Sequence, residues 1–232
     1  MQSSRIGDFT IYYENAEEFR VLKREVFSRN DYYIELDAER PLIVDAGANI
    51  GDTALYFKRL YPQAKIIAVE PFPRNVALLR RNIVENQLSD VCVVEAALAA
   101  KRGGITLYAD TSGYDWFTTV SVHEQGWDKQ QKTAAITLPA VTLSDLVPSG
   151  NIDLLKLDIE GAETQVLPAI QKELPRIRNI IFEYHPVSGR SPEALVRMLE
   201  RAGYEVEARV EGAVRPNPRE VRELSMMTAV RQ

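Results

Sequence analysis

Short apolar runs alternate with segments of helical periodicity along this chain, and the alternation constrains its fold more than any other feature. Five such runs lie at 41–46, 65–70, 91–97, 152–159 and 177–185. All but the third are followed by a segment in which apolar residues recur every three or four positions, as on the buried side of a helix. Strands that are apolar throughout are typical of a parallel sheet covered by helices on both faces. The pattern therefore predicts a doubly wound α/β fold.

Two regions depart from the alternation. Residues 101–143 contain two strand-like runs, 103–110 and 133–141. We expect residues 101–140 to form an insert of strands and a loop between the third and fourth strands of the sheet. The last two strand-like runs, 204–211 and 223–230, are joined by only a short segment, which favours an antiparallel pair at one edge.

Length, charge and composition narrow the class of protein. A chain of 232 residues fits one domain, 1–232, in which residues 1–40 form a cap segment ahead of the first strand. The net charge of −5 gives no basic surplus for nucleic acid, and no apolar run approaches the ~20 residues of a membrane span. The polar, acidic start is unlike a signal peptide, so we expect a cytoplasmic protein. We expect it to bind neither nucleic acid nor a membrane. Its oligomeric state stays open. Cys92, the single cysteine, is expected to be a small core residue.

The turn after the first run, VDAGANIGDT at 44–53, has the small residues of a nucleotide site. A phosphate loop needs a lysine after its last glycine, and none follows Gly51. A dinucleotide site needs G-x-G-x-x-G, whereas three residues separate Gly47 from Gly51. Asp45 would repel a pyrophosphate, but it is compatible with S-adenosylmethionine, which carries a sulfonium and an ammonium and no phosphate. The turn therefore favours S-adenosylmethionine as the ligand.

A second acid supports this interpretation. Glu70 ends the second run, where an acid accepts hydrogen bonds from ribose hydroxyls in dinucleotide folds. The alternatives are that Glu70 caps a helix, that Asp45 only forms the turn, and that the glycines only make it tight. The predicted cofactor-binding residues are Asp45, Gly47, Asn49, Gly51, Glu70 and Asp158.

Five stretches together resemble the FkbM family of S-adenosylmethionine-dependent methyltransferases: VDAGANIGDT, AVEPFPRNVALLRRNI, EAALAAKRGGITLY, PAVTLSDLV and IDLLKLDIEGAETQVL. The resemblance covers about 44–185. It implies a class I methyltransferase fold, with a Rossmann-like sheet of about seven strands whose last strand is antiparallel. It also implies methyl transfer to a hydroxyl of a small molecule such as a sugar or secondary metabolite. Residues 110–131 and the tail after Gly203 match no pattern of the family, so the acceptor stays open.

Methyl transfer to a neutral alcohol is helped by a general base, and the ends of the fourth and fifth runs provide candidates. Asp158 ends the fourth run, and Glu183 and His185 end the fifth, where a period of two places them on one face. We predict His185 as the base, oriented by Asp158 or Glu183, because its intrinsic pKa suits proton transfer near neutral pH. A divalent ion held by the same three residues is the less favoured alternative, because Mg²⁺ and Mn²⁺ prefer all-oxygen ligands.

Substrate contacts are expected from the insert and from the turn after the fourth run. Trp116 and Trp127 lie among polar residues, as in a loop that covers a ring-shaped substrate, and the alternative is packing on the sheet. Glu160 is a further substrate contact or a helix cap, and Tyr32 and Tyr33 either cover the cofactor or pack in the core. Two other functions stay open: N-methylation of a small amine, and a non-catalytic module that only binds the cofactor.

Overall fold

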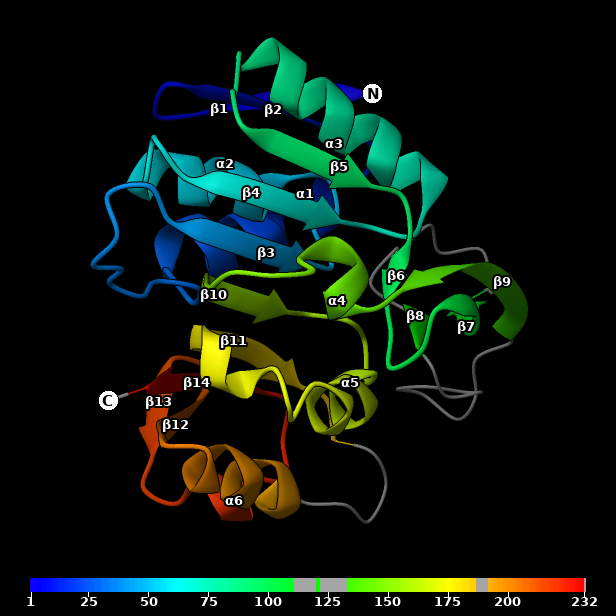
Figure 1. Cartoon of the computed structure of the whole chain (residues 1–232). Helices are drawn as coiled ribbons and strands as arrows, with labels where there is room; N and C mark the ends of the chain where they lie inside the picture. Colours follow the sequence, from blue (N-terminus) through cyan, green and yellow to red (C-terminus); the bar gives the residue numbers. More distant parts are fainter. Residues whose placement is uncertain (111–119, 122–132, 187–191, 232) are drawn as a thin grey trace.

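The computed structural model describes residues 1–110, 120–121, 133–186 and 192–231, and the central element is an eight-stranded sheet (Figure 1). The sheet has the strand order β13-β12-β14-β11-β10-β3-β4-β5. Each apolar run of the sequence contains one of its strands. The strands are β3 (Leu42–Ala46), β4 (Lys65–Val69), β5 (Val91–Val94), β10 (Ile152–Leu157), β11 (Ile177–Tyr184), β12 (Tyr204–Val210), β13 (Ala213–Arg215) and β14 (Ser225–Arg231).

The strands from β11 to β5 are parallel, and β14 runs antiparallel between β11 and β12. The predicted antiparallel pair is therefore confirmed, with β12 and β14 as its members. The short strand β13 pairs with β12 at the edge and brings the count to eight, one more than the expected number.

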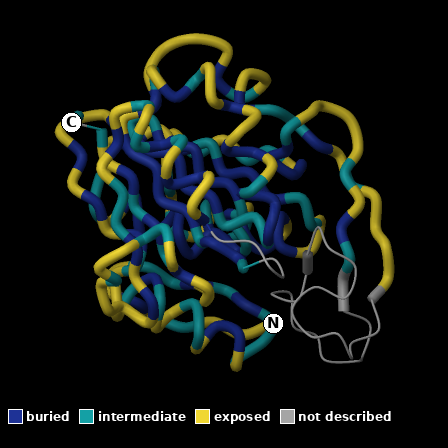
Figure 2. Tube along the Cα trace, turned by 90° about the horizontal axis from the view of Figure 1, so that it is seen from below, coloured by how far each residue is buried: buried dark blue, intermediate teal, exposed yellow. Residues whose placement is uncertain are grey.

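Alternate residues of the same strands face two different cores, which confirms the doubly wound arrangement. Val44 and Leu155 pack with α4 (Leu143–Leu146), α5 (Glu163–Ala169) and α6 (Glu193–Arg201). Their chain neighbours Ile43 and Leu154 pack on the other face, with α2 (Asp52–Leu60) and α3 (Pro73–Glu85). The strands are accordingly buried between layers whose outer surfaces are exposed (Figure 2). No helix in the described part of the chain is long and apolar enough to cross a bilayer.

The insert forms a second sheet of order β6-β9-β7-β8. Its strands are β6 (Ala97–Leu98), β7 (Gly103–Asp110), β8 (Val120–Ser121) and β9 (Thr133–Val141). The two strands predicted in this region are confirmed as β7 and β9. Figure 1 shows this sheet beyond the arrowheads of β3 and β4, so it stands at the carboxyl edge of the central sheet.

The N-terminal segment folds onto the same molecule. A hairpin of β1 (Gln2–Ile6) and β2 (Phe9–Tyr13) leads into α1 (Ala16–Leu22) and a π-helical segment, η1 (Lys23–Ser28). The side-chain oxygens of Asn82, on α3, and of Asn86, the residue after its last turn, accept the backbone N–H groups of Tyr12 and Thr10 at 2.7 and 2.8 Å. These bonds fix the hairpin, and with it the start of α1, beside α3.

The prediction for Cys92 is wrong, because its side chain is exposed. Cys92 lies on β5, the edge strand of the central sheet. Val91 and Val93 pack on the core shared with α2, and Cys92 points to the opposite face. The layer of helices on that face does not cover the sheet edge.

Candidate active site

Two hollows open at the carboxyl ends of the parallel strands and meet there. The first extends over about 680 Å³ and the second over about 1210 Å³, with the open space at their mouths included. Both are lined by Gly47, Asn49, Asp158 and Glu160. Ligands of open α/β sheets bind at the carboxyl ends of the strands. One ligand that crosses the shared border could therefore occupy parts of both hollows.

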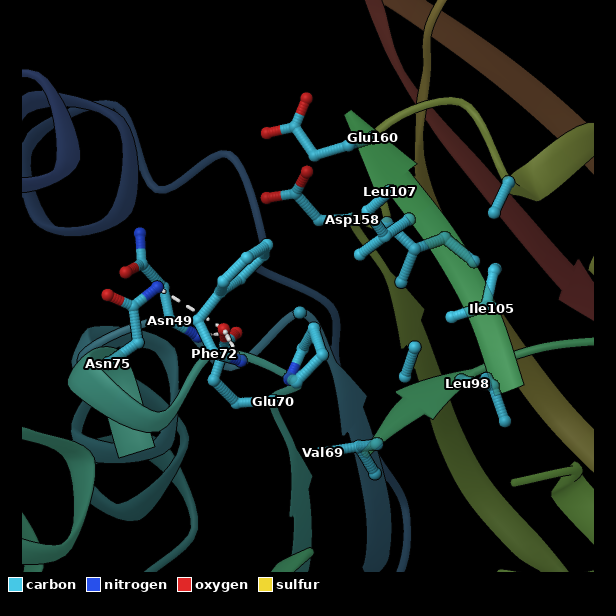
Figure 3. Close-up of a pocket in the computed structure, with 15 residues that line it drawn as sticks. Asn49, Val69, Glu70, Phe72, Asn75, Leu98, Ile105, Leu107, Asp158 and Glu160 are labelled. Carbon is cyan, nitrogen blue, oxygen red and sulfur yellow. Dashed lines mark hydrogen bonds between the residues drawn. The ribbon is translucent and has the colours of Figure 1, made fainter. Parts of the chain in front are cut away.

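The first hollow lies between the central sheet and the insert (Figure 3). Its apolar wall includes Val69, Phe72, Leu98, Ile105 and Leu107. Its polar groups include Asn49, Glu70 and Asn75. An apolar slot with a few convergent polar groups suits a flat, partly polar ligand such as a nucleoside.

Glu70 is fixed at the rim of this hollow. Its carboxylate accepts the backbone N–H groups of Asn49 at 3.0 Å and of Phe72 at 3.1 Å, and the side-chain amide of Asn75 at 3.2 Å (Figure 3). Burial nevertheless raises the pKa of Glu70 to about 7. The three bonds orient the carboxylate, and a carboxylate has about four acceptor sites, so acceptor capacity remains for hydroxyl donors of a ligand.

The glycines of the turn after β3 are required by packing. Gly47 has φ +78°, and a Cβ there would lie 1.8 Å from the carbonyl oxygen of Asp158. Gly51 has φ +90°, and a Cβ there would lie 2.6 Å from Cδ1 of Leu79. Both conformations favour glycine. A Cβ at position 47 would collide with backbone, whereas a Cβ at position 51 would displace the end of the Leu79 side chain. The tight turn accounts for the two glycines without a ligand, although Gly47 still lines both hollows.

Asp45 has its cationic partner within the chain, which the sequence argument did not foresee. Its Oδ1 lies 3.2 Å from Nζ of Lys156, and Thr53 donates a hydrogen bond of 2.6 Å to its Oδ2. Lys156 is the register neighbour of Asp45 on β10, and it also donates to the carbonyl of Gly47 at 2.6 Å. The lysine inside the apolar run LLKLD was the available signal for a buried ion pair. The charge of Asp45 therefore does not by itself require a cationic ligand.

Two other buried acids were missed by the sequence analysis. Glu18, on α1, and Asp52, the first residue of α2, are 5% and 2% exposed and line the second hollow. Among the described residues, Oε1 of Glu18 and Oδ1 of Asp52 have no hydrogen-bond partner. In the sequence, Glu18 resembles a solvated acid of an amphipathic helix, and Asp52 resembles an ordinary acid at a helix start. Neither sequence pattern therefore distinguishes an acid that binds a ligand from a solvated acid or from an acid at a helix start.

The buried acids predict an unusual dependence of stability on pH. Burial raises the pKa values of Glu18 and Asp52 to about 7, as it does for Glu70. A carboxyl group whose pKa is higher in the folded state stabilises the fold at low pH, and that contribution is lost as the pH rises through about 7. The melting temperature of the ligand-free protein should therefore fall as the pH rises from about 4 to about 7, the range between the ordinary pKa values of these carboxyl groups and their raised values in the fold.

The isosteric variant Asp52→Asn should melt about 2–4 °C above the wild type at pH 8, for a gain of about 1 kcal/mol. It should melt at the wild-type temperature near about pH 3, where the Asp52 carboxyl group is protonated in both the folded and the unfolded state. Calorimetric scans of both proteins at the two pH values measure this. A lower melting temperature of Asp52→Asn at pH 8 would mean that the charged carboxylate stabilises the ligand-free fold.

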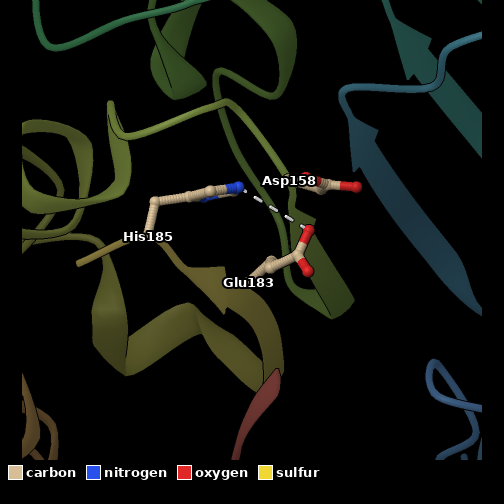
Figure 4. Close-up of side chains that lie close together, drawn as sticks. All are labelled: Asp158, Glu183 and His185. Carbon is tan, nitrogen blue, oxygen red and sulfur yellow. Dashed lines mark ion pairs between the residues drawn. The ribbon is translucent and has the colours of Figure 1, made fainter. Parts of the chain in front are cut away.

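Asp158, Glu183 and His185 come together at the border of the second hollow (Figure 4). Each residue has one atom that could bind a metal ion, and these three atoms lie within 4.8 Å of one another. Nε2 of His185 is 3.8 Å from Oε2 of Glu183. Nδ1 of His185 lies 3.2 Å from Oε1 of the buried Glu163. The hydroxyl of Tyr32 donates to Oδ2 of Asp158 at 2.9 Å. The expected proximity of these three residues is found, with Glu163 and Tyr32 as partners that the sequence did not indicate.

The charges of this group differ from those assumed for a histidine base. Burial lowers the pKa of the His185 ring, but the hydrogen bond with Glu163 and the charges of Glu163 and Glu160 outweigh burial and raise the pKa to about 10. Burial and the charge of Asp158 raise the pKa of Glu183 well above its usual range. Near neutral pH, His185 is therefore an imidazolium and has no lone pair for a proton. Of the two carboxyl groups, Asp158 and Glu183, Asp158 is the ionised one. Burial raises its pKa, but the charges of Lys156 and His185 outweigh burial and lower the pKa.

The remaining predicted contacts have different outcomes. Trp116 and Trp127 lie outside the described residues. Glu160 lines both hollows, and its backbone has φ +55°, a conformation uncommon for a residue other than glycine. Tyr32 is buried and lines the second hollow, whereas Tyr33 is 57% exposed. The structure therefore brings Glu160 and Tyr32 to the hollows.

Comparisons with known proteins place the chain in a class and a family. One solved structure with the same fold is the magnesium protoporphyrin IX methyltransferase ChlM of Synechocystis PCC 6803, which contains bound S-adenosylmethionine. The TM-score is 0.51 and the sequence identity is 13%. The match covers 95% of this chain and 86% of that chain. The fold is that of class I S-adenosylmethionine-dependent methyltransferases. Residues 45–206 match the methyltransferase FkbM domain.

Curated relatives agree with this family. Methyltransferase sdnD of Sordaria araneosa is 33% identical over 228 residues, covering 86% of this chain and 88% of the relative. The 2-O-methyltransferase NoeI of Sinorhizobium fredii is 28% identical over 160 residues, covering 64% of this chain and 65% of the relative. The chain therefore belongs to the FkbM methyltransferase family, and it is an enzyme that transfers methyl groups.

Proposed function

We propose that this protein transfers a methyl group from S-adenosylmethionine to a hydroxyl of a small molecule such as a sugar or glycosylated metabolite. The observation that carries the proposal is the meeting of the two hollows beside an ionised carboxylate, Asp158. A donor in the first hollow and an acceptor in the second would come together at that carboxylate. The relative NoeI, a 2-O-methyltransferase by name, supports a hydroxyl acceptor.

The residues of the first hollow fit the adenosine part of the cofactor. The apolar wall around Phe72 and Leu98 would hold the adenine, and the oriented carboxylate of Glu70 would accept the ribose hydroxyls. Asn49 and Gly47, at the border, would face the part of the cofactor that enters the second hollow. When bound, the cofactor supplies an electrophilic methyl group on a cationic sulfur.

The second hollow provides the groups that an alcohol acceptor needs. The proton of the acceptor hydroxyl passes to Asp158, which lines both hollows and is ionised. Tyr32 and Lys156 hold this carboxylate, and Lys156 Nζ lies 3.8 Å from its Oδ2. His185 and Glu183 position it and balance its charge. General-base assistance of this kind contributes roughly 10²–10⁴ to the rate, and alignment of the acceptor with the methyl group contributes further.

A divalent ion at Asp158, Glu183 and His185 is a second candidate role for the same residues, because their donor atoms are close enough for one ion. Activity that EDTA abolishes and that Mg²⁺ or Mn²⁺ restores would favour this role, and activity unaffected by EDTA would favour Asp158 as the base. N-methylation remains the alternative reaction, since a neutral amine needs no base.

The most general test of the function uses labelled cofactor. Purified protein, incubated with methyl-labelled S-adenosylmethionine and fractionated cell metabolites, should transfer label to a hydroxylated compound. Label confined to amines would support N-methylation. Cofactor binding with no transfer to any fraction would support a non-catalytic module.

Cofactor binding has a separate prediction at Glu70. Glu70→Ala should weaken S-adenosylhomocysteine binding by roughly 1.5–3 kcal/mol, the scale of hydrogen bonds to a charged group. Titration calorimetry measures this, with Glu95→Ala, an exposed acid after β5, as the control. The wild type should show no comparable binding of NAD. An unchanged affinity in a folded Glu70→Ala protein would remove the ribose assignment.

A further inference from the structure

Glu18 and Asp52 are buried acids that the proposed mechanism does not use. They are 5% and 2% exposed, and each has an oxygen without a hydrogen-bond partner among the described residues. A buried carboxylate costs several kcal/mol unless it is paired and hydrogen-bonded. Two incompletely paired acids in one hollow therefore indicate a cationic ligand.

The position of the two acids connects them to the cofactor end of the second hollow. The side chain of Asn49, which lines both hollows, is close enough to the Glu18 carboxyl group to oppose the rise of its pKa. Asp52 directly follows Gly51 at the end of the same turn, and helix α2 begins at this residue. Both acids therefore approach the border between the hollows from the side of the turn after β3. Asp158 and His185 approach it from β10 and β11 instead.

Among the described residues, two cations act by their charge on these acids, Arg74 on Glu18 and Lys156 on Asp52, but both form their ion pairs with other acids. Lys156 lies 3.2 Å from Oδ1 of Asp45 and donates to the carbonyl of Gly47. Arg74, the cation that acts on Glu18, forms an ion pair with Glu14. A compact ligand cation with several N–H donors, such as a primary ammonium, can satisfy the remaining carboxylate oxygens.

We propose that Glu18 and Asp52 bind the α-ammonium group of the methionine moiety of S-adenosylmethionine. The inference rests on the proposed function, because it takes the adenosine part of the cofactor to lie in the first hollow beside Glu70. The methionine part then extends past Gly47 and Asn49 into the second hollow. Helix α1, which precedes the matched segment 45–206, thereby becomes part of the cofactor site.

The test compares two ligands that differ only in the ammonium group. Calorimetric titrations use S-adenosylhomocysteine and its deamino analogue with the wild type, Glu18→Gln and Asp52→Asn. The control is Glu17→Gln, which removes an exposed acid from the same helix. The wild type and the control should bind S-adenosylhomocysteine roughly 10- to 100-fold more tightly than the deamino analogue. Each of the two test variants should lose most of that preference, while its affinity for the deamino analogue stays near the wild-type value.

Either of two results would overturn the inference. One is an unchanged preference in both variants, and the other is an equal loss of affinity for both ligands, which would indicate a distorted site. Circular dichroism identifies a variant that fails to fold, and the other variant then carries the test. If the wild type binds neither ligand, the proposed function fails as well. If it binds both ligands equally, the cofactor assignment stands and only the ammonium assignment fails.

Discussion

Asp158→Asn should lower kcat on a hydroxyl acceptor by about 10²–10⁴ at saturating cofactor, because the carboxylate that accepts the proton is replaced by an amide of the same shape. Asparagine can still accept the hydrogen bond from Tyr32, so the variant should fold. The control is Asp153→Asn, at the amino end of the same strand, where the carboxylate accepts the backbone N–H of Leu42 at 2.8 Å. That change should affect stability and leave kcat within a few-fold of the wild type.

His185 offers the result that would contradict this assignment. If the wild-type rate rises with pH through an apparent pKa that is absent in His185→Ala, then His185 is the base and Asp158 orients it. If Asp158→Asn keeps near-full activity in the presence of EDTA, the acceptor needs no base at this position, as for a neutral amine. A loss of activity on chelation alone would identify the three residues as ligands of a divalent ion.

Gly47→Ala should have the largest effect on stability of any single methyl addition discussed. Its Cβ would lie 1.8 Å from the carbonyl oxygen of Asp158, so the turn or the end of β10 would have to move. We expect a loss of about 4 kcal/mol or more, or no folded protein, since losses of this size follow from severe overpacking and backbone strain. The variant should also bind S-adenosylhomocysteine weakly, because Gly47 lines both hollows.

A substitution at a second glycine, Gly212, measures the cost of the left-handed backbone conformation without a steric clash. Gly212, at the hairpin between β12 and β13, has φ +83°, and a Cβ there would meet no atom within 4 Å. Gly212→Ala should cost only the roughly 1–2 kcal/mol of the left-handed conformation. Denaturant unfolding of both variants measures the difference. Equal losses would show that the close approach of the turn to Asp158 does not contribute.

The fold was predictable because each strand of the parallel core is an apolar run of its own. The order of the strands in the sheet and the register of their pairing were not predictable in the same way. Lys156 lies beside Asp45 only because β10 pairs with β3, and nothing local to either residue indicates that pairing. The argument that Asp45 selects a cationic ligand was therefore incomplete, although the family it pointed to is correct.

The site was predictable to the extent that it lies at strand ends. Asp158, Glu183 and His185 come together because parallel strands end at one edge of the sheet. Their proton affinities were not predictable, since the pKa of His185 depends on Glu160, in the turn after β10, and on Glu163, at the start of α5. Glu18 reaches the hollow from a helix whose docking no sequence period reveals.

The central claim is methyl transfer to oxygen, and the most direct measurement is the bond formed in the product. The protein is incubated with methyl-¹³C S-adenosylmethionine and the acceptor fraction, and the product is examined by ¹³C–¹H correlation NMR. We predict a methoxy signal coupled through the oxygen to a carbinol position of the acceptor, and a much weaker signal after the same incubation time with Asp158→Asn. A signal from a methyl group on nitrogen or carbon would contradict the account, as would unlabelled product from an enzyme that binds the cofactor.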